Sequence, residues 1–146
     1  MKSPEVSATG RGGGTPSAAA ANEKESIRRI IQEGNYQVLV EEAERIGQEL
    51  VQQRLTTSQI RNVFGEVKRL QMRFDPHRLR MLKPKLAYMA ARAKSGGPRL
   101  RDVLTAAVDA VFAGNPSEAD VLQRFRRMVD FFEAILAYHK AFGGRD

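Results

Sequence analysis

Apolar residues recur every three or four positions along most of this chain, and that spacing constrains its fold more than any other feature. Leu39, Ala43 and Ile46, for example, follow one another at intervals of four and three residues. Such intervals place the side chains on one face of an α-helix. No segment shows the alternation of apolar and polar residues, bounded by hairpin turns, that is typical of β-strands. The sequence therefore predicts an all-α fold, a compact bundle of five or six helices.

The N-terminal stretch MKSPEVSATGRGGGTPSAAAA differs from the rest because it is rich in Gly, Ala, Ser and Pro. It has too little apolar surface to offset the entropy lost on ordering. We therefore expect a disordered tail over residues 1–21 and one helical bundle domain over residues 22–144. The Asn22 side chain can accept a hydrogen bond from a free backbone N–H, so we predict that the first helix begins there and stops at Gly34.

A later segment, LTTSQIRNVFGEVKRL at residues 55–70, carries a clear helix start. Thr56 and Gln59 have the spacing of a capping box, in which each side chain accepts a hydrogen bond from the other residue's backbone N–H. Asp75 and Pro76 should end this helix and begin the next segment. Apolar spacing then continues through Pro84, which leaves two alternatives. Either Pro84 lies in the first turn of a new helix, or one helix is kinked there.

The last predicted helix follows the turn at residues 115–117 and runs to Gly143. It is apolar around more of its circumference than one face of a small bundle requires, because Phe131, Phe132 and Tyr138 add to its regular apolar stripe. Such a helix either lies at the centre of the bundle or turns part of its surface to a partner subunit. We expect the central position.

Positive charge is concentrated in the middle third of the chain. The net charge is +7, but residues 54–101 contain 13 Lys and Arg against only Glu66 and Asp75, a local charge of +11. The two flanking regions each carry −2. An ordinary solvated helix interleaves both signs, so this polarity favours a polyanionic partner.

The basic residues fall on the predicted outward faces of two helices. Four lie on the side of residues 55–74 that faces away from the apolar arc: Arg61, Lys68, Arg69 and Arg73. In the following helix Lys85, Tyr88 and Arg92 form one stripe. Arg and Lys donate charge-assisted hydrogen bonds to phosphates, and a tyrosine ring can stack on a base. The array therefore predicts nucleic-acid backbone binding without sequence specificity; the alternative is a solvated basic surface with Tyr88 packed at its edge.

The sequence offers little for catalysis or metal binding. It has no cysteine, which excludes disulfides, thiolate zinc sites and cysteine nucleophiles. Its two histidines, His77 and His139, lie in different segments and lack any metal-ligand spacing. Asp130 and Glu133 lie one turn apart, but no further ligands accompany them. We therefore expect no enzymatic activity, no metal and no cofactor.

The chain also lacks membrane signals. No apolar run approaches the roughly 18 residues that a membrane-spanning helix needs, and the N-terminus lacks the apolar stretch of a secretory signal. We expect a soluble, cytoplasmic protein with no membrane partner.

Three stretches together resemble the small-subunit family of the type III-A CRISPR interference complex, the Csm complex. They are LTTSQIRNVFGEVKRL at 55–70, LKPKLAYMAARA at 82–93 and MVDFFEAILAYHKAFGG at 128–144. The resemblance spans roughly residues 22–143. It implies a small, helical, non-catalytic subunit of a ribonucleoprotein complex for antiviral defence, present in several copies that stack as a filament.

The same resemblance implies particular partners and residues. The partners are other Csm-type subunits, further copies of the chain, and the backbone of the guide RNA paired with target RNA. The positions that match the family motifs are Gln59, Arg61, Lys83, Lys85 and Arg92. Two alternatives remain: a helical DNA-binding or architectural factor, which would present a helix to a major groove as part of a dimer, and an adaptor that binds only proteins.

Overall fold

The computed structural model describes residues 18–146, and all of its regular structure in that range is helical. The predicted N-terminal tail up to residue 17 lies outside the described residues. Six helices have eleven or more residues, and a seventh is a five-residue turn. In chain order the helices are α1 (Ala18–Glu33), α2 (Tyr36–Gln52), α3 (Thr57–Met72), α4 (Pro76–Arg80), α5 (Leu82–Arg92), α6 (Gly97–Phe112) and α7 (Glu118–Ala141). The prediction of a compact all-α bundle is confirmed.

Most helix ends follow the predicted local signals. Thr56 accepts a hydrogen bond from the backbone N–H of Gln59, and the Gln59 side chain accepts one from Thr56 in return, so the capping box is present. Asp75 caps α4 through the backbone N–H of His77. Of the two alternatives for Pro84, the structure has the first, because α5 begins at Leu82 and places Pro84 in its first turn.

The predicted start of the first helix was wrong. α1 begins at Ala18, four residues before Asn22, and Asn22 therefore lies inside the helix rather than capping it. The four residues before Asn22 are alanines, the strongest helix formers. The helix therefore extends through them and passes the expected cap at Asn22.

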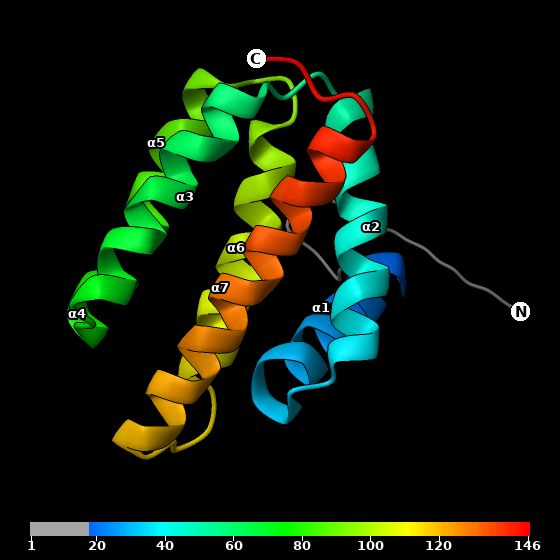
Figure 1. Ribbon diagram of the computed structural model, residues 1–146. Helices are drawn as coiled ribbons and strands as arrows, with labels where there is room; N and C mark the ends of the chain where they lie inside the picture. The colour runs from blue at the N-terminus through cyan, green and yellow to red at the C-terminus, as the bar shows by residue number, and fades with distance from the viewer. Residues whose placement is uncertain (1–17) are drawn as a thin grey trace, which may run out of the picture.

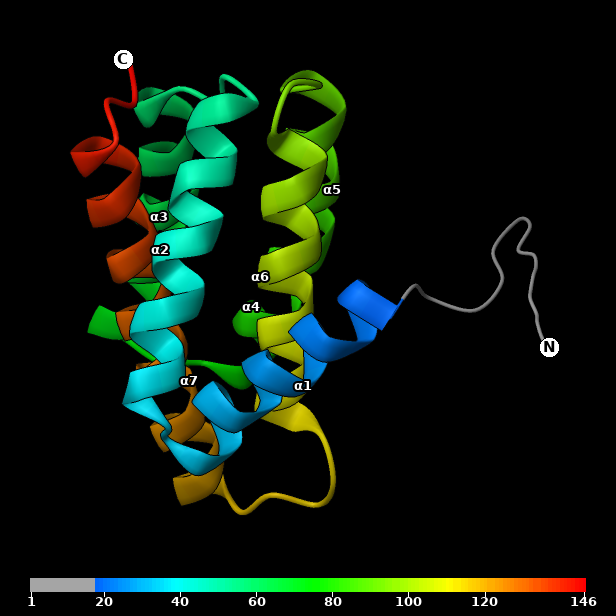
Figure 2. The same cartoon turned by 90° about the vertical axis from the view of Figure 1, so that its right-hand side faces the viewer.

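The long helix α7 lies at the centre of the bundle. It packs against α1, α2, α3 and α6, while α5 packs on α6. Figure 1 shows α3, α4 and α5 on one side of the central α6 and α7, with α1 and α2 on the other side. Figure 2 shows α1 running obliquely across the lower part of α6 toward the lower end of α2. This placement confirms the expected central position of the last helix.

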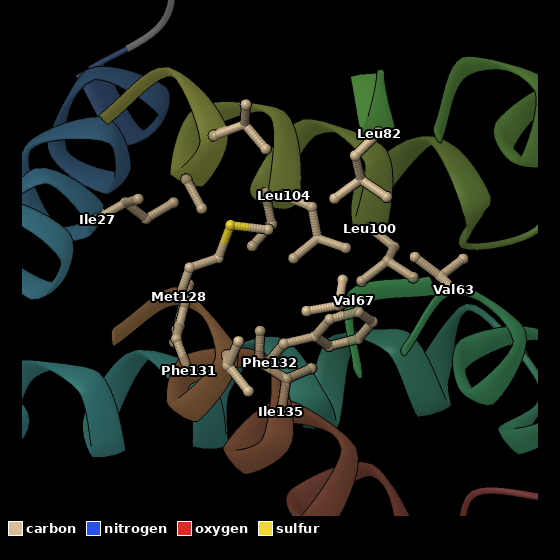
Figure 3. Close-up of a cluster of buried hydrophobic side chains, with 14 of the residues drawn as sticks. Ile27, Val63, Val67, Leu82, Leu100, Leu104, Met128, Phe131, Phe132 and Ile135 are labelled. Carbon is tan, nitrogen blue, oxygen red and sulfur yellow. The ribbon is translucent and has the colours of Figure 1, made fainter. Parts of the chain in front are cut away.

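The core explains why α7 is apolar around so much of its circumference. Phe131 and Phe132 are both fully buried although they are adjacent in the chain. The rings of Phe132 and of Phe64 on α3 form a T-shaped pair, with their centroids 5.2 Å apart. Figure 3 shows Phe131 and Phe132 together with Met128 and with residues from α1, α3, α5 and α6. Two neighbouring faces of one helix are thus buried against different helices.

No helix in the described range is both long and apolar enough to cross a lipid bilayer.

Candidate nucleic-acid interface

Eight of the 13 basic residues of the middle third lie on α3, α4 and α5, which form one edge of the bundle (Figure 1). α3 packs on α7, whereas α5 packs on α6. Because these two helices rest on different neighbours, their outer surfaces do not close against each other. Two adjoining grooves lie between them, and they share Glu66, Met81, Leu82 and Lys85 as lining residues.

Each groove combines apolar side chains with cationic ones. The groove nearer α4 is lined by Glu66, Arg69, Leu70, Arg73, Phe74, Asp75, Pro76, Arg78, Met81, Leu82 and Lys85. The other groove is lined by Gln59, Asn62, Val63, Glu66, Met81, Leu82, Pro84, Lys85, Leu86, Tyr88, Met89, Arg92 and Ala93. Long cations beside a concave apolar surface suit a flexible polyanion, because the stems pack while the charged heads stay in solvent.

The structure brings six of the nine predicted site residues together at these grooves: Gln59, Arg69, Arg73, Lys85, Tyr88 and Arg92. Gln59 has a structural duty there as well, because its side-chain oxygen accepts from the Thr56 backbone N–H at 2.9 Å. That contact leaves the Gln59 amide NH₂ as the group that could donate to a ligand.

The other three predicted residues lie outside the grooves. Arg61 and Lys68 are exposed on α3, and the Lys68 ammonium is 5.8 Å from the centroid of the Phe64 ring. Lys83 turns toward α6, where its ammonium donates to the Asp109 carboxylate at 2.7 Å. Arg61 and Lys68 therefore extend the basic surface along α3, and Lys83 extends it across α5 toward α6.

Tyr88 and Arg92 form a small platform at the rim. The Tyr88 side chain is 65 % exposed, and its hydroxyl accepts a hydrogen bond from Arg92 at 3.0 Å. The Arg92 guanidinium carbon lies 5.6 Å from the centroid of the same ring, within the range of a cation–π contact. An exposed ring held beside a guanidinium can stack on a base while the cation meets the adjoining phosphate.

One acidic residue lies inside this basic surface. The Glu66 carboxylate accepts a hydrogen bond from the Lys85 ammonium at 2.8 Å and another from Arg69. The bond from Lys85, together with that from Arg69, holds the pKa of the Glu66 carboxyl below its ordinary value. Glu66 is therefore an anion at neutral pH, and two of the predicted RNA-binding cations are its partners.

The structure adds residues that the sequence analysis did not single out. Arg78 on α4 lines one groove, and Asn62 on α3 lines the other. Arg80 stacks over the Phe112 ring of α6, with its guanidinium carbon 3.8 Å from the ring centroid. Arg78 belongs to the same basic third of the chain, so its charge alone could have identified it as a candidate. The five residues of α4 are too few for apolar periodicity to predict which way its side chain points.

Other residues considered for chemistry lie apart. His77 is exposed at the start of α4, whereas His139 is buried near the end of α7. Asp130 accepts a hydrogen bond from the Tyr36 hydroxyl at 2.5 Å. Within residues 18–146 there is no group of three or more histidine, aspartate or glutamate side chains placed to hold a metal ion.

Comparison with known proteins gives one match. The family model described as Csm2 Type III-A matches residues 33–145, which include α2 to α7 and so all nine predicted site residues. No curated protein and no solved structure matched the chain. Because the family model covers most of the chain, the protein belongs to the Csm2 family of small subunits of the type III-A Csm complex.

Proposed function

We propose that this small subunit holds the sugar-phosphate backbone of the guide RNA and target RNA without reading sequence, as a non-catalytic part of a cytoplasmic antiviral complex. Its partners there are other Csm-type subunits and further copies of the chain in a filament. Family membership supports the assembly, and the cationic grooves support the RNA contact.

The observation that carries the RNA contact is the composition of the α3–α5 edge. Its grooves are lined by Arg69, Arg73, Arg78, Lys85 and Arg92, against the carboxylates of Glu66 and Asp75. Phosphate contacts supply affinity and position but carry no sequence information. RNA is commonly held through shape and backbone, so a surface of this kind needs no recognition helix in a major groove.

Removing two cations at this edge should weaken RNA binding for every sequence alike. We expect Arg61→Ala combined with Lys85→Ala to lower the affinity of the full chain for short RNA duplexes roughly tenfold at moderate salt. The slope of log affinity against log salt concentration should become shallower by about two, one for each lost phosphate contact. Fluorescence anisotropy over a salt series, with RNAs of two unrelated sequences, measures both quantities.

A matched pair on α1 provides the control. Lys24→Ala combined with Arg29→Ala removes the same charge from exposed positions on the other side of the bundle. An equal loss in this control would show that net charge alone drives binding. A loss confined to one RNA sequence would contradict backbone recognition, and a strong preference for duplex DNA would favour the DNA-binding alternative. The RNA should be recovered intact from every reaction, because the chain is proposed to be non-catalytic.

The assembly is tested separately. A tagged chain purified from its host should bring along other Csm-type subunits and protected guide RNA. Protein partners that persist after nuclease treatment, together with a basic surface that tolerates mutation, would instead support an adaptor that binds only proteins.

A further inference from the structure

Glu66 occupies an unusual position at the α3–α5 edge. It is the one acidic residue in the sequence of α3, and α5 contains none. Its carboxylate bonds Arg69 one turn away on α3 and Lys85 across the groove on α5. Glu66 also lines both grooves. One carboxylate thus engages two of the cations that the proposed function assigns to RNA.

The contact between Glu66 and Lys85 also links the two helices that border the groove. Within the described residues, Glu66 and Lys85 form the one side-chain polar contact that joins α3 directly to α5. The backbones of the two helices pack against α7 and α6 respectively. The ion pair therefore spans the groove rather than reinforcing a packed interface, and its loss leaves the core contacts of both helices in place.

The pair is accessible to a competing anion. The side chains of Glu66, Lys85 and Arg69 are 34 %, 60 % and 68 % exposed. Exposed ion pairs of this kind contribute little to folding stability, because solvent screens them and long side chains lose entropy on pairing. A phosphate oxygen accepts from the same ammonium and guanidinium donors as a carboxylate does. RNA phosphates and Glu66 therefore compete for Lys85 and Arg69.

We propose that Glu66 is a positioning residue that occupies Lys85 and Arg69 in the free protein and is displaced from them by RNA phosphates. This inference rests on the proposed function, because it concerns how the same cations meet RNA. Glu66 limits affinity in two ways: it must release its partners, and its negative charge then remains beside the bound phosphates. Glu66 also holds the Lys85 and Arg69 side chains in place before RNA binds, but this ordering offsets only a small part of the lost affinity.

The test uses Glu66→Gln, which keeps the shape and hydrogen-bonding capacity of the side chain but removes its charge. In the full chain we expect it to raise the affinity for a fluorescein-labelled RNA duplex roughly three- to tenfold at low salt. The salt dependence should become steeper by about one unit of slope. Glu25→Gln is the matched control, because Glu25 is an exposed carboxylate on α1 that bonds Arg28 and also pairs with Arg29.

A second measurement separates competition from a merely structural role. Lys85→Ala should cost more affinity in the Glu66→Gln background than in the wild type, because only in the wild type must Lys85 leave a carboxylate first. A structural role would change the melting temperature but leave the cost of Lys85→Ala the same in both backgrounds.

Three outcomes are decisive. Tighter binding by Glu66→Gln, with unchanged binding by Glu25→Gln, supports the inference. The inference is overturned, while the proposed function stands, if the wild type binds RNA and Glu66→Gln leaves the affinity unchanged or lowers it. The same holds if Glu66→Gln changes the affinity only as much as Glu25→Gln does. If the wild type and Glu66→Gln both fail to bind RNA at low salt, the proposed function fails and the inference fails with it.

Discussion

His139 shows how one residue can serve packing rather than chemistry. Its side chain is fully buried near the end of α7. Its Nε2 lies 2.7 Å from the Leu55 carbonyl oxygen, which can only accept, so Nε2 carries the proton. Its Nδ1 lies 3.5 Å from the Thr57 hydroxyl. Gly144 passes over the ring, where an added Cβ would lie 2.0 Å from Cε1. The histidine thus joins α7 to the loop before α3.

Replacing this histidine should therefore be costly. We expect His139→Ala to lower the free energy of unfolding by about 2–4 kcal/mol, because it leaves a cavity and an unpaired buried carbonyl. His77→Ala is the control, since His77 is exposed and its loss should change stability by no more than about 0.5 kcal/mol. Urea denaturation followed by circular dichroism measures both. Equal losses of unfolding free energy in the two variants would mean that burial and hydrogen bonding of the His139 ring do not stabilise the fold.

At the scale of elements, the packing of α2 on α7 depends on a close approach at Gly47. A Cβ built on Gly47 would lie 2.8 Å from the Cβ of Tyr138 and 3.0 Å from the backbone nitrogen of His139. At Gly65, in the middle of α3, an added Cβ would meet no atom within 4 Å apart from its own stretch of helix. The two glycines thus differ in their surroundings. Gly47 allows a close helix contact that a side chain would block, whereas Gly65 only lowers the helix propensity of α3.

Alanine at these two positions should have opposite effects. Gly65→Ala should stabilise the protein by about 0.5–1 kcal/mol, because alanine loses less backbone entropy in a helix. Gly47→Ala has the same gain, but steric overlap with the backbone of α7 should make it destabilising by about 1–3 kcal/mol. Thermal unfolding of the two variants beside the wild type measures this difference. Stabilisation by Gly47→Ala would show that the helices separate easily.

At the scale of the whole molecule, charge is divided between two sides of the bundle. Opposite the basic edge, Glu23 of α1 bonds Arg99 of α6 at 2.5 Å and Arg45 of α2 at 2.9 Å. The Glu23 side chain is only 15 % exposed. Burial raises the pKa of its carboxyl, but the hydrogen bonds from Arg99 and Arg45 outweigh burial and hold the pKa below its usual range. On this side the guanidinium groups of Arg45 and Arg99 are paired with glutamates of α1 and α2.

The Glu23 network should make stability depend on pH in a defined direction. A carboxyl whose pKa is lower in the folded state stabilises the fold above its unfolded pKa, and this contribution is lost as pH falls through the folded value. At neutral pH we expect Glu23→Gln to lower the free energy of unfolding by about 1–2 kcal/mol. The difference from the wild type should shrink below about pH 4.5, where the unfolded carboxyl becomes protonated.

Denaturant unfolding across an acid pH series tests this prediction. Glu25→Gln again serves as the control, because its exposed carboxylate should matter much less. A Glu23→Gln deficit that stays constant as the pH falls would contradict the linkage and point to lost packing instead.

Most of the helices and many of their ends could be read from the chain, because both depend on residues three or four positions apart. The capping box at Thr56 and Gln59, the Asp75 cap and the apolar arc of α3 are local patterns of this kind. The excess of cations over residues 54–101 is likewise visible without a structure. The error at Asn22 has the same origin, since alanine propensity extended the helix beyond a local cap signal.

The site itself depended on contacts between distant residues, for which local spacing carries no signal. Lys85 meets Glu66 from 19 positions away, and Glu23 meets Arg99 from 76. Lys83 lies only two positions from Lys85 in the chain, yet its ammonium donates to Asp109 of α6. The chain alone specified an amphipathic, basic set of helices. The packing of α3 on α7 and of α5 on α6 decided where the grooves lie and which cations line them. The physical reason is that burial of the apolar face of a helix determines where its polar face points.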